Sequence, residues 1–209
     1  MKSIKNPNIK LFLKDLKKQC KDHKIKLTLV NDHLIDYGKE GITGIAGWFD
    51  GKELACAIGG KEGSWIKTLV HESCHLDQFI EKSKFWKESN IRRGNLTENW
   101  INGKEYPQKE VRIEFNREFR LELDCEKRSV EKIIKYNLPV PIERYIQQAN
   151  SYLWIYKLIP KIRQWYTGYG PSNCDELTAK MPKHFNVNYH QMPKKIEKLY
   201  MKYCFTNEN

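Results

Sequence analysis

Residues 64–81, SWIKTLVHESCHLDQFIE, decide the fold. Their apolar positions recur at helical spacing, which predicts one helix with Ser64 as its N-cap. Residues 71–75 read His-Glu-Ser-Cys-His, the HExxH pattern. Positions i and i+4 share one face of a helix, so the imidazoles of His71 and His75 can reach one metal ion. The carboxylate of Glu72 would then lie beside a metal-bound water and could take its proton.

The sequence before this helix predicts a further helix and a small sheet. Residues 7–23 have the apolar spacing of an amphipathic helix, and Ile25, Leu27 and Leu29 then alternate with polar residues as in a strand. Two apolar runs follow, GITGIAGWF at 41–49 and ELACAIGG at 53–60, joined by Asp50-Gly51. Such a pair between apolar runs indicates a hairpin. We therefore expect a small, mostly antiparallel sheet of about three strands.

The sequence after the HExxH helix is mainly helical. Residues 82–109 are polar and irregular and are predicted to be an inserted loop. Helices are predicted over 109–136, over 141–158 with Pro160 as its end, and over 193–203. The chain is therefore expected to be one α+β domain, 1–209. About 1–81 would hold the first helix, the sheet and the HExxH helix, and 110–209 a helical part.

The helix predicted at 109–136 could supply a third metal ligand, since a catalytic zinc usually has three protein ligands. At 100° per residue, Glu122 and Glu126 both fall within its apolar stripe, whereas Asp124 falls on the opposite side. A carboxylate on a core face is costly unless it is paired or bound to a metal. One could bind zinc while the other orients a histidine, or either could pair with Arg112 or Arg120. The stripe consists of Phe115, Phe119, Val130 and Ile133.

An HExxH helix followed by Glu-x-x-x-Asp on a later helix resembles the gluzincin pattern of zinc metallopeptidases. Over about residues 40–135 the chain looks like a minimal member of this family. The resemblance implies a zincin-like fold in which Zn2+ is held by His71, His75 and Glu122, with Glu72 as the catalytic base. Glu126 stands where the family has Asp or Asn, so it is both a candidate for orienting a histidine and an alternative ligand.

The resemblance also implies zinc-dependent hydrolysis of a peptide bond in a protein or peptide substrate. An edge strand of the sheet, here residues 53–59, would bind the substrate backbone. His184 and His190 remain further alternatives for the third ligand. The small size and the Lys, Asn and Ile content also fit a phage- or plasmid-type protein acting on host proteins.

Composition limits the other classes of protein. No apolar run approaches the roughly 20 residues of a membrane span, and the N-terminal sequence lacks the apolar core of a signal peptide. We therefore expect a cytoplasmic protein, in the host cytoplasm if phage-encoded, with no membrane partner. The six cysteines show no CxxC spacing, which argues against an all-cysteine zinc site.

The charge leaves a second function open. Lys and Arg number 37 against 26 Asp and Glu, a net charge of +11, which often accompanies nucleic-acid binding. The lysines are spread along the whole sequence, as on an ordinary soluble surface. The alternative is a zincin-fold protein that binds nucleic acid or a protein partner, with little or no peptidase activity. Such a protein would tolerate Glu72→Gln but would need cations such as Arg92 and Arg93.

Overall fold

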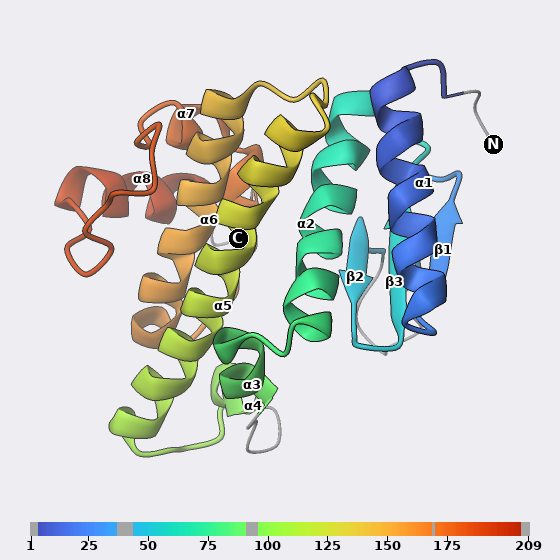
Figure 1. Cartoon of the computed structure of the whole chain (residues 1–209). Coiled ribbons are helices and arrows are strands. Elements are labelled where there is room, and N and C mark those ends of the chain that lie inside the picture. Colours follow the sequence, from blue (N-terminus) through green and yellow to red (C-terminus); the bar gives the residue numbers. More distant parts are fainter. Residues whose placement is uncertain (1–3, 37–43, 91–95, 169, 206–209) are drawn as a thin grey trace. The chain divides into compact units, whose positions relative to one another are not determined.

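The elements of the chain follow the expected order of helix, sheet and helices. A computed structural model describes residues 4–36, 44–90, 96–168 and 170–205 (Figure 1). The chain divides into two units, which are described separately. Unit 1 comprises Met1–Trp86 and Cys125–Val140, and unit 2 comprises Lys87–Asp124 and Pro141–Asn209. No helix within the described ranges is both long and apolar enough to cross a membrane.

Unit 1 begins with helix α1, Pro7–Asp22, as the apolar spacing predicted. The side chain of Asn6 caps it by accepting hydrogen bonds from the backbone N–H groups of Asn8 and Ile9, and Pro7 occupies the first turn, where its missing N–H costs nothing. One face of the helix is buried, and the other carries charged residues. The buried residues are Ile9, Phe12, Leu13, Leu16 and Cys20.

The sheet has three strands in the order β1-β3-β2, namely β1 (Lys26–Val30), β2 (Gly47–Phe49) and β3 (Glu53–Ala57). The predicted hairpin between β2 and β3 is confirmed. Asp50 accepts hydrogen bonds from the backbone N–H groups of Lys52 and Glu53, and Gly51 adopts a φ of 88°, which favours glycine. However, β1 pairs in parallel with β3. The sheet is therefore mixed, and the expectation of a mostly antiparallel sheet was wrong.

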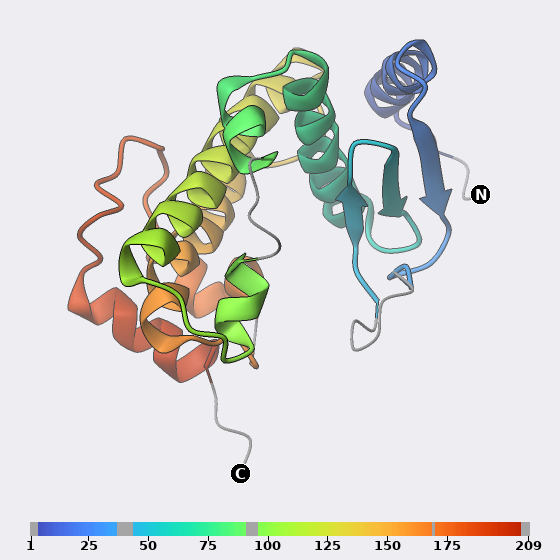
Figure 2. The ribbon, with the colours of Figure 1, turned by 90° about the horizontal axis from the view of Figure 1, so that it is seen from below.

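Helix α2, Glu62–Ile80, carries the HExxH residues and packs on β2 and β3. It lies on the same side of the sheet as α1 (Figure 2), and Gln19 of α1 donates a hydrogen bond to Asp77 of α2 over 2.7 Å. Its N-cap is Lys61 rather than the predicted Ser64, because the helix begins three residues earlier. On the opposite face of the sheet Ala55 and Ala57 pack against partly buried Trp48.

Residues 82–109, predicted to be an inserted loop, contain two short helices among the described residues. These are α3, Lys84–Asn90, and α4, Leu96–Ile101. Leu96 and Trp100 of α4 are buried in the core of unit 2. Two apolar anchors one turn apart are too few to show helical periodicity in an otherwise polar sequence, so the helix is not evident without its packing.

The rest of the chain contains α5 (Gln108–Lys135), α6 (Ile142–Ile162), a 3-10 helix η1 (Pro171–Asn173), α7 (Asp175–Thr178) and α8 (Lys194–Tyr203). Pro160 lies inside α6 instead of ending it. Proline removes only its own N–H from the helix, and the helix continues until Arg163, which adopts a left-handed φ of 57°. The fully buried Tyr200 of α8 donates a hydrogen bond to the main-chain oxygen of Ser151, which ties α8 to α6 in unit 2.

Candidate metal centre

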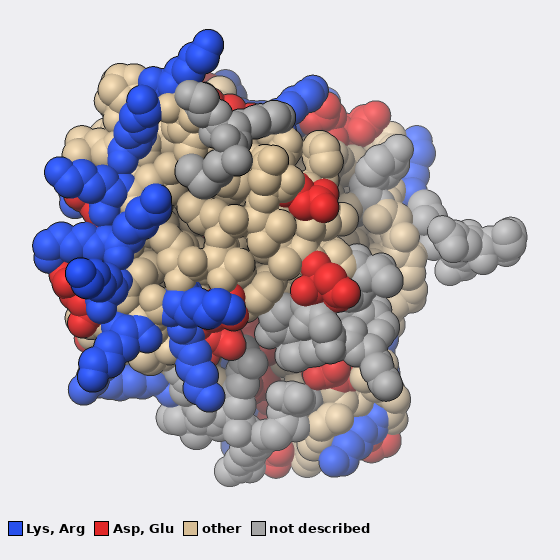
Figure 3. All heavy atoms as spheres, turned by 90° about the vertical axis from the view of Figure 1, so that its right-hand side faces the viewer, with Lys and Arg blue, Asp and Glu red and all other residues tan. Residues whose placement is uncertain are grey.

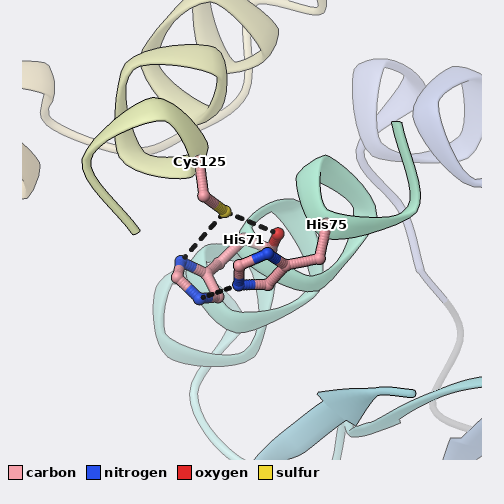
Figure 4. A group of neighbouring side chains, drawn as sticks. All are labelled: His71, His75 and Cys125. Atoms are coloured by element: carbon pink, nitrogen blue, oxygen red, sulfur yellow. Dashed lines mark hydrogen bonds between the residues drawn. The ribbon is translucent and has the colours of Figure 1, made fainter. Parts of the chain in front are cut away.

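Three side chains of unit 1 form a group that could hold a metal ion. His71 and His75 come from α2 and Cys125 from α5, and one ligand atom of each lies within 4.8 Å of the others (Figure 4). His75 and Cys125 are buried, and the side chain of His71 is 19% exposed. The predicted pair of histidines is thus present on one face of the helix, and beside it lies a thiol that the sequence does not indicate.

The two histidines approach each other through their Nε2 atoms, which are 3.2 Å apart. Their rings are nearly perpendicular, at 86°, with centroids 4.8 Å apart. Zn–N bonds of about 2.0–2.1 Å at a tetrahedral angle place two ligand nitrogens about 3.3–3.4 Å apart. The observed separation therefore fits two ligands of one zinc ion.

The other nitrogen of each ring faces a hydrogen-bond acceptor. His75 Nδ1 is 2.8 Å from Oε1 of Gln78, and His71 Nδ1 is 3.2 Å from Oε1 of Glu126. Amide and carboxylate oxygens only accept hydrogen bonds, so these contacts favour the tautomers that carry the proton on Nδ1. Each Nε2 then presents a lone pair toward the other ring. The 3.2 Å contact is a hydrogen bond when one ring carries its proton on Nε2, and both Nε2 lone pairs are available to a shared cation when both rings carry the proton on Nδ1.

Glu126 is 5% exposed and lies beside His71 rather than beside an arginine. Its second oxygen, Oε2, is buried and has no hydrogen-bond partner among the described residues. A buried carboxylate oxygen without a partner carries a desolvation cost, which a positively charged group at this site would offset. Arg120, one of the predicted alternative partners, instead pairs with Glu88 within unit 2 over 2.9 Å.

Glu122 lies one helical turn before Glu126 on α5 but belongs to unit 2, where it is half-buried. Its assignment as a zinc ligand stays a prediction. Within unit 2 it lies close to Tyr156. Burial raises the pKa of this tyrosine well above its usual value, and the neighbouring Tyr152 and the charge of Glu122 raise it further. The sequence alone does not predict that either tyrosine lies near this glutamate.

Glu72 lies on the side of α2 that faces the sheet. A Cβ atom at Gly47 of β2 would come within 3.4 Å of Glu72 Cγ and within 2.9 Å of Thr68 Cγ2. Only glycine permits this close approach of the strand to the helix. Burial raises the pKa of Cys56 on β3 to about 12, and the nearby charge of Glu72 contributes to the shift. The predicted catalytic base is therefore next to the strands.

The thiol of Cys125 contacts the same ring nitrogen as Glu126. Its Sγ lies 3.6 Å from His71 Nδ1 and donates a hydrogen bond to the main-chain oxygen of His71 over 3.3 Å. Cys74, inside the motif, is fully buried. Burial raises the pKa of its thiol, but hydrogen bonds with Cys125 and Ser129 and the charge of Lys132 outweigh burial and bring the pKa to about 7. The sequence feature that indicates a role for Cys125 is its position directly before the core-facing Glu126.

Other predicted residues lie elsewhere. Residues 53–57 form β3, the central strand, so the expectation that they are the edge strand was wrong; the edge next to α2 is β2. Apolar runs occur in central and in edge strands alike, so the sequence does not distinguish the two kinds of strand here. His184 and His190 are exposed residues of unit 2. Arg92 and Arg93 lie outside the described residues.

Comparison with protein-family models, with curated proteins and with solved structures gives no match. The function is therefore inferred from the residues of the site and their geometry.

Proposed function

We propose that the protein is a zinc-dependent peptidase in which His71, His75 and a carboxylate of α5 hold Zn2+. The observation that carries the proposal is the pair of Nε2 atoms 3.2 Å apart, with the Nδ1 atom of each ring beside an oxygen acceptor. This arrangement favours, in both histidines, the tautomer that leaves Nε2 free to bind a metal. For the third ligand we propose Glu122, with Glu126 as the residue that orients His71.

The residues around the pair have separate roles in hydrolysis. When bound, zinc would lower the pKa of a water molecule toward neutrality and polarise the substrate carbonyl. Glu72 would accept the proton of the attacking water on its carboxylate and then pass it to the leaving amine. Gln78 and Glu126 would hold the imidazole rings of His75 and His71 in place through Nδ1.

The position of β2 supports a peptide substrate. It is the last strand of the described sheet on the side next to α2, and Gly47 brings its backbone close to Glu72. An extended peptide could add to this edge through main-chain hydrogen bonds, as in other cases of β-augmentation. The carbonyl of the bound peptide would then lie near the proposed base.

An aromatic cluster adjoins the histidine pair and suggests a substrate preference. Phe49, Phe79 and Trp86 contact one another, with ring centroids 5.5 to 5.7 Å apart, and Trp86 also lies 6.4 Å from the ring of His75. All three are half-buried. They would favour an apolar side chain next to the cleaved bond, because contact with the cluster removes apolar surface from water.

The test combines metal analysis with proteolysis of fluorescently labelled casein, an unfolded protein. We expect about one zinc per chain in the wild type. Glu72→Gln should keep the zinc and lose at least about 100-fold in cleavage rate, since it removes the general base. Glu62→Gln is the matched control, because Glu62 is an exposed carboxylate in the first turn of the same helix.

Two results would contradict the proposal. One is a wild-type protein that binds no zinc even after zinc is added back to the stripped protein. The other is a Glu72→Gln variant that cleaves casein as fast as Glu62→Gln, since the carboxylate would then have no part in the reaction. If the Glu72→Gln variant still performs the function of the wild-type protein in the cell, that result would instead favour the alternative, a binding protein on a zincin-like scaffold.

A further inference from the structure

Four lysines of α1 align on one face of the helix. At 100° per residue, Lys10, Lys14, Lys17 and Lys21 fall within an arc of about 60°. All four side chains are exposed. Although lysines are spread along the whole sequence, folding therefore gathers these four into a row on unit 1. We name Lys10, Lys14, Lys17 and Lys21 the α1 lysine row.

The acidic residues of α1 lie away from this row. Asp15 and Asp22 are about 80° or more from its nearest edge on the helix. Asp15 accepts a hydrogen bond from Tyr136, and Asp22 pairs with Lys18. No lysine of the row forms an ion pair with a described residue.

This segregation has an energetic consequence. Lysines three and four residues apart are neighbours on a helix and repel one another, which destabilises the helix. The row contains three such neighbouring pairs, and neither carboxylate of α1 lies between them. A polyanion bound along the row would remove this repulsion.

Figure 3 shows the charged side chains on the side of the molecule that lies to the right in Figure 1. Lys and Arg side chains gather along one flank of this face, where α1 lies, whereas the middle of the face is largely uncharged. The buried side of α1 is already used by the core of unit 1, through Ile9, Phe12 and Leu16. Apart from Leu11, which is 50% exposed, the helix therefore offers charged and polar groups to a partner.

We propose that the α1 lysine row binds the phosphate backbone of a nucleic acid without reading its sequence. Protein interfaces are depleted of lysine and enriched in aromatic residues and arginine, and the row contains only lysine. An amphipathic helix that binds a membrane inserts an apolar face, which α1 has already buried. Lysines at regular spacing fit a backbone of regularly spaced phosphates, which they can contact as point charges. This proposal does not depend on the metal centre.

The test measures binding of the full chain to a labelled DNA duplex of about 20 base pairs by fluorescence anisotropy. Four lysine–phosphate contacts predict that log K falls with log salt with a slope of about −3.6, which is about a 150-fold loss of affinity between about 50 and 200 mM salt. Replacing the row by K10Q, K14Q, K17Q and K21Q together should make the slope less steep by about 3.6. The matching four arginine substitutions should keep the slope.

The chain offers a matched control on α8 in unit 2. Lys194, Lys195, Lys198 and Lys202 are also exposed, and changing all four to glutamine removes the same charge from a different helix. We expect this variant to bind the duplex nearly as tightly as the wild type. Glu72→Gln should bind it equally well, so a failure of the peptidase proposal would leave this one standing.

Three outcomes would overturn the proposal. The first is no binding of the duplex at about 50 mM salt, where phosphate contacts are strongest. The second is an equal loss in the α1 and α8 glutamine variants, because binding would then follow net charge alone. The third is tighter binding to vesicles of phosphatidylserine and phosphatidylcholine than to the duplex at equal phosphate concentration, which would assign the row to a membrane surface. A circular dichroism melt confirms that each variant is folded.

Discussion

Residue His71 has two neighbours at its Nδ1 atom, the carboxylate of Glu126 at 3.2 Å and the thiol of Cys125 at 3.6 Å. The carboxylate is the stronger acceptor, and the thiol already donates to the main-chain oxygen of His71. Under the proposed function, Glu126 would therefore orient the ring and Cys125 would contribute packing. A metal bound through His71 Nδ1 and Cys125 would reverse these roles.

Substitutions at these two residues separate the alternatives. Removal of an orienting residue typically lowers metal affinity by about 10- to 100-fold without removing the site. We expect this of Glu126→Gln, whereas Cys125→Ser should keep the wild-type affinity and Glu122→Ala should lose most of the zinc. Competition with a chelator measures the affinity. Absorption from sulfur-to-metal charge transfer in the cobalt-substituted wild type, absent in Cys125→Ser, would instead make Cys125 a ligand.

At the scale of elements, Lys132 of α5 joins two helices of unit 1. Its ammonium group lies 2.6 Å from Asp77 of α2 and donates hydrogen bonds to the main-chain and hydroxyl oxygens of Ser73, over 3.1 and 2.9 Å. Both charged side chains are largely buried, 14% and 20% exposed. Asp77 also accepts the hydrogen bond from Gln19 of α1, so this ion pair stands where three helices meet.

Removing one partner of such a pair leaves a buried charge without full compensation. Lys132→Met should therefore lower the free energy of unfolding by about 2–3 kcal/mol, somewhat less than for a fully buried pair. Lys127→Met on the same helix is the matched control, because Lys127 is exposed. Urea unfolding measures both variants, and equal midpoints for the two would show that the ion pair adds nothing to stability.

In unit 2, Lys157 of α6 is held in an unfavourable environment for a charge. Burial and the nearby Arg120 lower the pKa of its ammonium group to about 8, although it lies 4.0 Å above the ring of Phe119 and donates a hydrogen bond to Asn116 over 2.6 Å. The folded state therefore binds fewer protons than the unfolded state between about pH 8 and the usual lysine pKa of about 10.5. The contribution of this group to the free energy of unfolding therefore becomes more favourable to the folded state as the pH rises through that interval.

Lys157→Met should remove this dependence. Because the side chain is only half-buried, solvent screening reduces the expected gain in stability at pH 7 to on the order of 1 kcal/mol. Thermal melts at pH 7 and pH 9 measure the difference. Lys161→Met, an exposed position on the same helix, should melt as the wild type does at both pH values. A wild-type protein that loses stability from pH 7 to 9 relative to Lys157→Met would contradict the sign.

The sequence was informative where a local pattern determines the structure and uninformative where packing does. The HExxH helix and the Asp50-Gly51 hairpin follow from spacing and turn chemistry, and both are present. The parallel pairing of β1 with β3 does not follow, because alternation is the same in parallel and antiparallel strands. Likewise, helical periodicity placed Glu126 on the core face but could not show that Cys125 would lie beside His71.

At the scale of the whole molecule, the position of the histidine pair in unit 1 predicts which amides zinc protects. A ligand that binds only the folded state stabilises it by about 2.7 kcal/mol at 100 times its dissociation constant. The described contacts of the histidine pair lie within unit 1, on α2 and on α5 from Cys125 onward. We therefore expect added zinc to slow hydrogen exchange of amides in α2 and residues 125–135, while those of α8 in unit 2 keep their rates.

His75→Asn should abolish this protection, because it removes one Nε2 atom, and exchange followed by mass spectrometry measures both proteins. If zinc slowed exchange in α8 as strongly as in α2, or still protected α2 in His75→Asn, the metal would bind elsewhere and the proposed centre would be wrong.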